Sequence, residues 1–179
     1  MTDIVPAAPS GGGDKAKDVH SSSMSVCGAN LPPTVDARLK AVESYWLAIR
    51  PVPERLPGYQ HFQPLELSPY WPWMWIFNVH HLPLRFSYRF IGSEHMRAME
   101  LEATGRWVDE IRPRFSSEPG YQQFVDAAEF SRPGYYSGPP TYHVEKSYIG
   151  MERLILPMAS DGRNVDMILG VTIYACREN

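Results

Sequence analysis

The histidines are the residues most easily interpreted as metal ligands or as general acids and bases. There are six of them: His20, His61, His80, His81, His95 and His143. A zinc or iron site needs several ligands that converge at about 2 Å from the metal. His80 and His81 are adjacent at a strand end, so their side chains diverge. The segment SEHMRAME around His95 has one histidine where the helical metalloprotease motif has two. The sequence therefore predicts turn or surface histidines and no metal site.

Glu152 and Asp166 are the carboxylates best placed for acid–base chemistry, because they fall on two segments that are expected to pair as strands. Arg153 and Arg89 fall on the same expected sheet. A cluster of this kind could carry perturbed pKa values and act as an acid–base site. Cross-strand ion pairing on the sheet is the simpler interpretation, and it is the one that we favour.

The sequence contains no motif for nucleophilic catalysis or for phosphate binding. It has no GxSxG elbow and no glycine-rich phosphate loop, and its serine run, Ser21-Ser22-Ser23, lies near the N-terminus. The two cysteines, Cys27 and Cys176, are too few for a disulfide framework. No basic region followed by an apolar one marks a secretory signal. These features together favour a reducing, cytoplasmic location.

Composition argues against two further classes of protein. Hydrophobic residues make up 44% of the chain, which is enough for a packed core. The formal net charge is −3 and the basic residues are scattered, so no nucleic-acid partner is expected. The longest apolar runs, WPWMWIF and ILGVTIYAC, fall short of the roughly 20 residues that a membrane-spanning helix needs. We therefore expect no membrane insertion.

The elements that position these residues are clearest from residue 150 to residue 175. Apolar residues alternate along 165–175, and a similar alternation runs through 153–158. Asp161-Gly162 lies between the two segments and is a typical turn sequence. The pattern predicts a β-hairpin. Because an isolated hairpin is barely stable in water, it must belong to a larger sheet.

The N-terminal part is expected to hold a leader and one helix. Residues 1–33 are rich in Gly and Ser and predict a disordered leader. A helix should follow, with Thr34 as its N-cap and Pro51 as its end. Its apolar stripe consists of Leu39, Val42, Trp46 and Ile49. The stripe could pack on the sheet of the same chain, or it could form a dimer and relay helix with a second copy.

Further elements are expected between that helix and the hairpin. Residues 73–79 and 84–92 predict two strands, and a short helix and a longer helix from about residue 119 follow them. Tyr142 and Val144 are expected in a third strand. With strands at both ends and helices in the middle, the sequence predicts an α+β fold: a five-stranded antiparallel sheet with helices on one face.

A set of aromatic, Met and Leu side chains is expected between this sheet and its helices. Its members are Phe86, Tyr88, Phe90, Met96, Met99, Trp107, Tyr121, Phe124, Leu156, Met158, Met167 and Leu169. They could line an adaptable apolar ligand pocket. They could equally fill a core that has no ligand, which is the usual role of such residues.

Residues 34–177 resemble the PAS domain superfamily, and more narrowly an alphaproteobacterial family of small stand-alone PAS-like proteins. Short motifs carry the resemblance, in this order: Tyr45-Trp46 with Arg50, Leu56-Pro57, Pro64-Leu65-Glu66, Tyr88-Arg89 with Ile91-Gly92, Thr104-Gly105-Arg106, Glu152-Arg153, Leu156-Pro157, Asp161-Gly162, Val165-Asp166 and Leu169-Gly170. The resemblance implies a five-stranded antiparallel sheet that cradles helices and that senses a ligand or docks a partner. It implies no reaction.

The resemblance leaves the ligand open but disfavours two cofactors. Haem-binding relatives use a histidine on the long helix that faces the sheet, and PGYQQFVDAAEF has none; His95 on the preceding short helix is the nearest substitute. Flavin photosensors use a reactive cysteine in the helical segment, and neither Cys27 nor Cys176 lies there. No cofactor is therefore predicted.

Three functions are compatible with this sequence. The favoured one is a sensory or regulatory module that is not an enzyme, forms a homodimer, and signals to a separate effector protein. A small isomerase or hydratase is the enzymatic alternative, and it requires His143 or His95 beside an acidic residue in the pocket. A ligand-free structural adaptor would have a solid core without a cavity.

Overall fold

The computed structural model describes residues 28–100, 102–140 and 149–176. Its centre is one five-stranded sheet in which every neighbouring pair is antiparallel. The strands are β1 Met74–His81, β2 Leu84–Ile91, β3 Gly134–Gly138, β4 Ile149–Met158 and β5 Met167–Cys176. Their spatial order is β2-β1-β5-β4-β3. The predicted α+β class and the antiparallel five-stranded sheet are thus confirmed.

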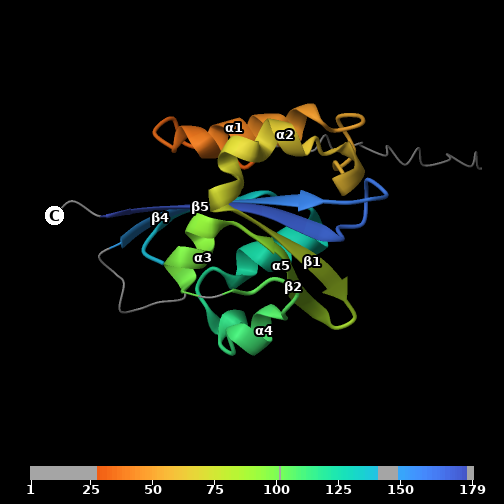
Figure 1. Ribbon diagram of the computed structural model, residues 1–179. Coiled ribbons are helices and arrows are strands. Elements are labelled where there is room, and N and C mark those ends of the chain that lie inside the picture. Colours follow the sequence, from red (N-terminus) through yellow and green to blue (C-terminus); the bar gives the residue numbers. More distant parts are fainter. Residues whose placement is uncertain (1–27, 101, 141–148, 177–179) are drawn as a thin grey trace, which may run out of the picture.

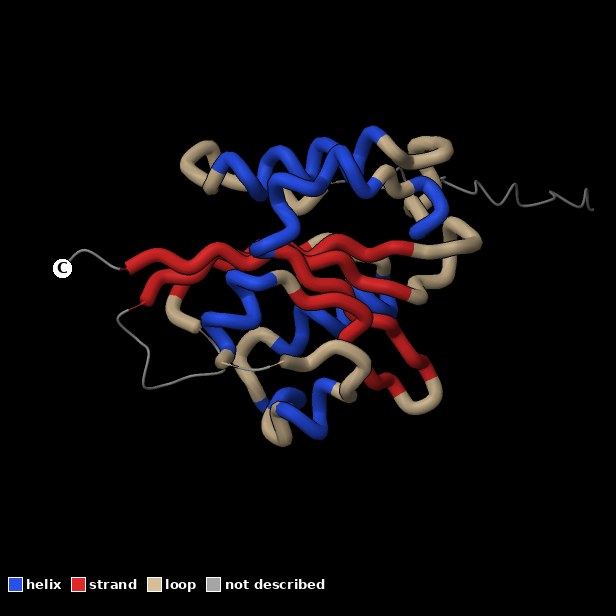
Figure 2. Tube along the Cα trace, viewed as in Figure 1, coloured by secondary structure: helices blue, strands red, loops and turns tan. Residues whose placement is uncertain are grey.

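Helices cover both faces of this sheet, as Figure 1 and Figure 2 show. α1 and α2 lie on one face, and α3, α4 and α5 lie on the other. The α-helices are α1 Ala37–Ala48, α2 Pro64–Leu67, α3 Ser93–Met99, α4 Val108–Ile111 and α5 Tyr121–Phe130. Short 3₁₀ helices span Tyr59–His61, Ser68–Trp73 and Phe115–Ser117.

The expectation of helices on one face only was therefore wrong. The two central C-terminal strands, β4 and β5, carry apolar side chains on both faces. Leu154 and Ile155 are consecutive, point to opposite faces and are both fully buried. Ile168 and Leu169 behave in the same way on β5. A strand that is apolar on both faces has to be covered on both, and α1 supplies the second cover.

The helix α1 packs on the sheet of its own chain. Leu39, Val42 and Trp46 have no exposed surface, and Ile49 is the half-buried C-cap. The indole Nε1 of Trp46 donates a hydrogen bond of 3.0 Å to the carbonyl oxygen of Pro157 in β4. The apolar stripe is thus occupied within the monomer and is not a free dimer surface. A dimer that uses another face of α1 remains a proposal.

The N-cap of α1 differs from the expected one. Asp36, not Thr34, caps the helix, and its Oδ1 accepts a hydrogen bond from the amide of Arg38 at 2.8 Å. The guanidinium of Arg38 also pairs with the Asp36 carboxylate, and this interaction lowers the pKa of Asp36. Most of the predicted leader lies outside the described residues. Residues 28–33 of that leader are among the described residues, and Ala29 and Leu31 pack against the core.

The hairpin of β4 and β5 forms with the expected alternation. Met158 pairs with Met167 at its closed end, and Leu154 pairs with Val171 farther along. In the connection, the Asp161 carboxylate accepts hydrogen bonds from the amides of residues 163 and 164, both at 2.8 Å. These hydrogen bonds lower the pKa of Asp161 to about 2. Gly162 has a φ of 76°, which explains a glycine at this position.

Other boundaries moved from their expected places. The third strand, β3, lies at Gly134–Gly138, upstream of Tyr142 and Val144, which fall outside the described residues. The short helix α3 ends at Met99, where Glu100 takes a left-handed conformation, and not at Thr104-Gly105. Within the part of the chain that the structure describes, no helix combines the length and the apolar character that crossing a bilayer requires.

Candidate functional site

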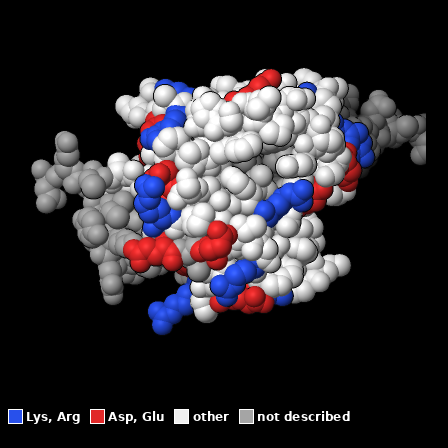
Figure 3. Space-filling model, in the orientation of Figure 1, with Lys and Arg blue, Asp and Glu red and all other residues white. Residues whose placement is uncertain are grey.

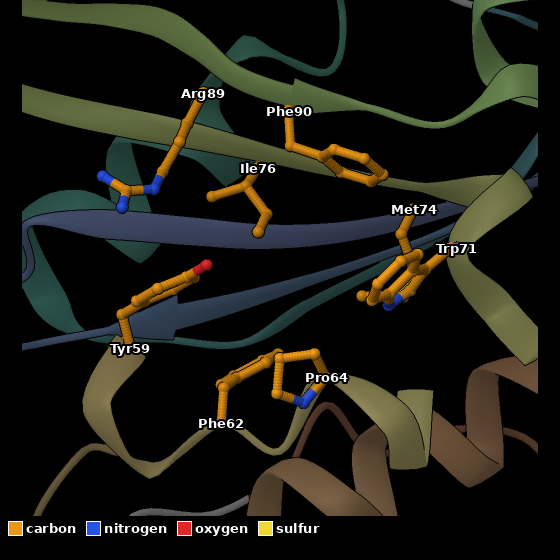
Figure 4. Close-up of a pocket in the computed structure, with 8 residues that line it drawn as sticks. All are labelled: Tyr59, Phe62, Pro64, Trp71, Met74, Ile76, Arg89 and Phe90. Carbon is orange, nitrogen blue, oxygen red and sulfur yellow. The ribbon is translucent and has the colours of Figure 1, made fainter. Parts of the chain in front are cut away.

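A groove of about 310 Å³ opens between β1 and β2 and the segment that links α1 to β1 (Figure 4). It lies on the same face of the sheet as α1. Its lining is largely aromatic and apolar, with one charged member: Tyr59, Phe62, Pro64, Trp71, Met74, Ile76, Arg89 and Phe90. Figure 3 shows that large areas of the surface in this view carry no charged side chain, while basic and acidic groups lie next to each other.

The linking segment is held in short turns by its prolines. Pro64 stands at the start of α2, where its missing N–H costs nothing, and residues 68–73 continue as a 3₁₀ helix. The amide of Gly58 donates to Nδ1 of His61 at 2.9 Å. The rings of Tyr59 and Phe62 then stack with centroids 6.2 Å apart. This local geometry turns two aromatic side chains toward the sheet and forms one wall of the groove.

Gly92 allows the other wall to approach β2. A Cβ at this position would overlap the backbone carbonyl groups of Trp71 and Pro72. The amide of Gly92 also donates to the carbonyl oxygen of Met74 at 2.7 Å. Only a residue without a side chain fits between these backbones. Trp71 is therefore carried to the rim of the groove, where its ring meets that of Phe90 at 6.4 Å.

A β-bulge places Arg89 and Phe90 in the groove together. Ile76 pairs with Phe90 and Phe77 pairs with Tyr88, so Arg89 is the extra residue of β2 without a partner on β1. In a regular strand, consecutive side chains point to opposite faces. Here both side chains line the same groove, as Figure 4 shows. Bulges of this kind often redirect a side chain next to a functional site.

Arg89 supplies the positive charge of the groove. Its guanidinium carbon lies 4.6 Å from the centre of the Tyr59 ring. Among the described residues, no carboxylate lies within ion-pair distance of it. Arg85 on the same strand is a contrast, because it is paired with Asp109 at 2.9 Å. Arg89 is thus exposed to solvent at the mouth of an apolar groove and can meet an incoming anion.

The wall of the groove is attached to α1. The hydroxyl of Tyr45, on α1, accepts a hydrogen bond of 2.7 Å from the amide of Gln63. The Tyr45 ring also meets the Phe62 ring edge-on, at 5.6 Å between centroids. Phe62, which lines the groove, is thus in direct contact with α1.

The residues expected to form one pocket are instead divided between the two faces of the sheet. Buried beneath α3 and α5 are Phe86, Tyr88, Met99 and Phe124, and buried on the α1 face are Leu156, Met158, Met167 and Leu169. Half-buried are Met96, Trp107 and Tyr121, with Trp107 beneath the guanidinium of Arg85. Of the twelve expected residues, Phe90 alone belongs to the groove.

Seven of the eight groove residues were absent from the prediction. A signal for them exists in the sequence, because the segment YQHFQPLELSPYWPW is rich in aromatic residues and broken by prolines. Arg89 was considered as a partner for carboxylates and as part of the Tyr88-Arg89 motif, but not as a groove residue. Its true neighbours could not be inferred without the bulge.

The space between the sheet and α3 with α5 is closely packed where its large side chains meet: Trp75, Phe77, Tyr88 and Phe124 have at most 2% of their surface exposed. It holds a cavity of about 10 Å³, lined by Trp75, Phe77, Tyr88, His95, Arg112, Phe124, Met151, Arg153 and Thr172. This is room for about one water molecule. The expected apolar ligand pocket at this place is therefore a packed core with a small polar centre.

Polar groups in this core are well buried. Nδ1 of His95 lies 2.8 Å from the hydroxyl oxygen of Tyr174. Nη2 of Arg153 donates to Oε1 of Gln123 at 2.8 Å, while its Nε has no hydrogen-bond partner. Burial, and then the arginines 112 and 153, lower the pKa of His95 to about 3. Burial likewise lowers the pKa of Arg153 to about 10.

The expected ion pairs of Glu152 and Asp166 do not form with either arginine. Glu152 accepts hydrogen bonds from the amide of Asp36, at 2.8 Å, and from the hydroxyl of Tyr135, at 2.9 Å. Asp166 accepts one from the amide of Ser160 at 3.1 Å, and its Oδ1 is buried without a partner. Both carboxylates thus hold backbone segments in place. They do not form an acid–base cluster.

The histidines give no catalytic or metal-binding geometry in the described part of the chain. His95 meets a tyrosine rather than an acidic residue, and His143 lies outside the described residues. His81 lies between the carbonyl oxygen of Val165, at 2.6 Å, and the Glu129 carboxylate, at 3.2 Å, and these contacts raise its pKa. No group of three metal-ligating side chains occurs among the residues described.

Comparison with models of protein families and with curated protein sequences finds no match for this chain. Function is therefore inferred from the geometry of the groove and its attachment to α1.

Proposed function

We propose that this protein is a PAS-like sensory or regulatory module that binds a small ligand in the groove and signals through α1 to a separate protein. The proposal involves no catalysis. The strand order β2-β1-β5-β4-β3, with α3, α4 and α5 between β2 and β3, supports the resemblance to PAS domains. A sheet of this kind with a helix on its second face suits a binding role.

The groove is the observation that carries the proposal. Its volume of about 310 Å³ lies at the lower end of the range for ligand pockets. Aromatic and apolar walls favour a flat apolar molecule, and Arg89 at the mouth favours an acidic group on that molecule. We therefore assign the ligand to the class of small aromatic or planar apolar anions.

Signalling is proposed to follow from the contact between Phe62 and Tyr45. A ligand that packs against Phe62 favours one position of this ring over others, and the hydrogen bond from Gln63 to Tyr45 connects that segment to α1. A ligand shifts such an equilibrium only through its different affinities for the two positions. The partner would then bind the exposed side of α1 in one of these states.

Two fluorescent probes test the groove and its charge separately. 1-Anilinonaphthalene-8-sulfonate and N-phenyl-1-naphthylamine share their ring system, and only the first carries a sulfonate. The folded protein should bind both. Arg89→Gln should weaken binding of the sulfonate probe about tenfold, the effect of losing one charged hydrogen bond, and leave the neutral probe unchanged. Tyr59→Ala should weaken both probes, because it removes one wall.

Arg97→Gln is the matched control. Arg97 lies on α3, is exposed and does not line the groove; its exposed pair with Glu94 contributes little, so its loss mainly changes net charge. Equal weakening by Arg89→Gln and Arg97→Gln would show that the probe responds to net charge and would contradict the proposed site. Hydrogen exchange should also slow in α1 when the sulfonate probe binds. Unchanged exchange there would contradict the relay.

A structural adaptor is the second candidate, and the nearly filled interior favours it. The space beneath α3 and α5 holds a cavity of only about 10 Å³, close to the solid core that an adaptor predicts. A folded protein that binds neither probe would support this alternative over the sensory one.

A further inference from the structure

We propose that the small cavity beneath α3 and α5 is a binding site for one chloride-sized monovalent anion, held by Arg153. This site lies on the opposite face of the sheet from the groove, so it does not depend on the function proposed above. Four observations support the proposal: the burial of Arg153, a hydrogen-bond donor of Arg153 without a partner, the positive charge around the cavity, and the size of the cavity.

Burial and hydrogen bonding single out Arg153. Only 4% of its surface is exposed. Its guanidinium is fixed between the rings of Phe124, at 4.8 Å, and Tyr136, at 5.5 Å, and by the hydrogen bond from Nη2 to Gln123. None of the described residues offers its Nε an acceptor. Arg153 also lines the small cavity, so an anion in the cavity would lie beside a buried cation whose hydrogen bonds are incomplete.

Gly120, just before α5, leaves room for the guanidinium of Arg153. A Cβ on Gly120 would come 2.5 Å from Nη2 of Arg153. The backbone before α5 therefore lies directly against the charged group, and a side chain at position 120 would displace the guanidinium. The position of Arg153 is thus defined by its surroundings and not by solvent.

The charges around the cavity sum to a positive value. Arg112 is paired with Glu118, and these two charges cancel. His95 is neutral near pH 7, because its pKa is lowered to about 3. Arg153 remains charged, and none of the described carboxylates lies within ion-pair distance of it. An uncompensated buried cation is unfavourable, and a bound monovalent anion would neutralise it.

The size of the cavity limits the occupant. About 10 Å³ admits one water molecule or one anion of similar size, and excludes an organic acid. Water can fill the cavity but does not neutralise the charge. Chloride or bromide would do both, and Trp75 and Phe77 also line the cavity. Water alone is the competing occupant.

Thermal unfolding at constant sodium concentration separates these occupants. Sodium chloride is replaced stepwise by sodium gluconate, so ionic strength stays the same and the large anion cannot enter. Above the dissociation constant, each tenfold rise in chloride should raise Tm by roughly 3–6 °C for a chain of this size. Bromide should act like chloride. Equal Tm values in chloride and gluconate would overturn the proposal and assign the cavity to water.

Two variants locate the effect. Arg153→Met should fold without dependence on chloride, because it replaces the cation by an apolar side chain of similar length. Arg97→Gln removes an exposed cation and should keep the full chloride effect of the native chain. If Arg153→Met does not fold, ³⁵Cl NMR tests the site instead, because chloride that binds the native protein has a broadened resonance. Broadening that bromide reverses supports the site, and its absence contradicts it.

Discussion

His95 and Tyr174 hold the α3 layer to the last strand of the sheet, with Nδ1 of the imidazole 2.8 Å from the phenolic oxygen. The two rings lie nearly parallel, with centroids 5.9 Å apart. The Trp75 ring is also nearly parallel to the His95 ring, with centroids 6.0 Å apart. The imidazole is therefore buried against two aromatic rings, and burial lowers its pKa, which favours the neutral form.

This enclosure predicts loss of stability at mildly acid pH. In the unfolded chain His95 has a pKa near 6.5, whereas in the folded chain it is about 3. Between these values the unfolded state binds a proton that the folded state does not, so stability falls as pH falls. From pH 7.5 to 5.5 the loss should be about 1.4 kcal/mol. Urea unfolding at both pH values measures it.

The variant His95→Gln isolates this residue in the same measurement. It should be less stable at pH 7.5 but should lose about 1.4 kcal/mol less on acidification than the native chain. His81 acts in the opposite direction, because its pKa is raised by the Val165 carbonyl and by Glu129. Both chains contain His81, so the difference between them reports His95. An identical pH dependence would contradict the buried neutral imidazole.

Trp46 should contribute to monomer stability rather than to association. Trp46→Phe should destabilise the protein by about 1–3 kcal/mol, because the buried carbonyl oxygen of Pro157 loses its donor. Ser44→Ala, at an exposed position of the same helix, is the control and should change stability by less than about 0.5 kcal/mol. Urea unfolding gives both values. If Trp46→Phe changed the molar mass measured by light scattering but left stability unchanged, this result would contradict the packing of α1 on its own sheet.

Gly170 should not tolerate a side chain. A Cβ there would overlap the Trp75 ring, which is held by a hydrogen bond of 2.9 Å from its Nε1 to Thr172 Oγ1. Gly170→Ala should therefore cost about 1–3 kcal/mol or more through overpacking. At Gly134, the nearest atom to a new Cβ lies 3.6 Å away. Gly134→Ala should thus be neutral or slightly stabilising in thermal unfolding. Equal effects of the two would contradict this packing.

Glu152 should fix the start of α1. Its carboxylate accepts from the Asp36 amide and from the Tyr135 hydroxyl. Glu152→Ala removes both acceptors and should speed hydrogen exchange of the first turn of α1 at least tenfold, with a loss of about 1–3 kcal/mol in stability. Glu66→Ala, on exposed α2, is the matched control. Unchanged exchange at residues 36–39 would contradict this role.

Local sequence signals were sufficient for the parts of the fold that depend on neighbouring residues. Alternation along β4 and β5, with Asp161-Gly162 between them, defines a hairpin because strand period and turn chemistry agree there. The stripe of Leu39, Val42 and Trp46 likewise gave the buried face of α1. What such a stripe packs against is a tertiary property, and the sequence left both alternatives open.

The groove could not be predicted for a different reason. Strict alternation assigned Phe90 to the same face as Tyr88, and one extra residue at Arg89 reversed that assignment. A bulge changes the face of every residue that follows it, yet it leaves no clear mark in composition. The assumption of a single helical layer had a similar cause. Continuous apolar runs such as that of Leu154 and Ile155 indicate burial on both faces, which alternation alone does not show.

The position of β5 has a consequence for how the chain reaches this structure. β5 lies between β1 and β4 although it comes last among the described strands, and Met74 pairs with Val171 almost a hundred residues away. Until β5 is synthesised, β1 and β4 each have an unpaired inner edge, and such edges promote aggregation. Pairings over this distance also slow folding. We therefore expect the sheet to assemble late in synthesis and nascent chains that end before residue 167 to need chaperones.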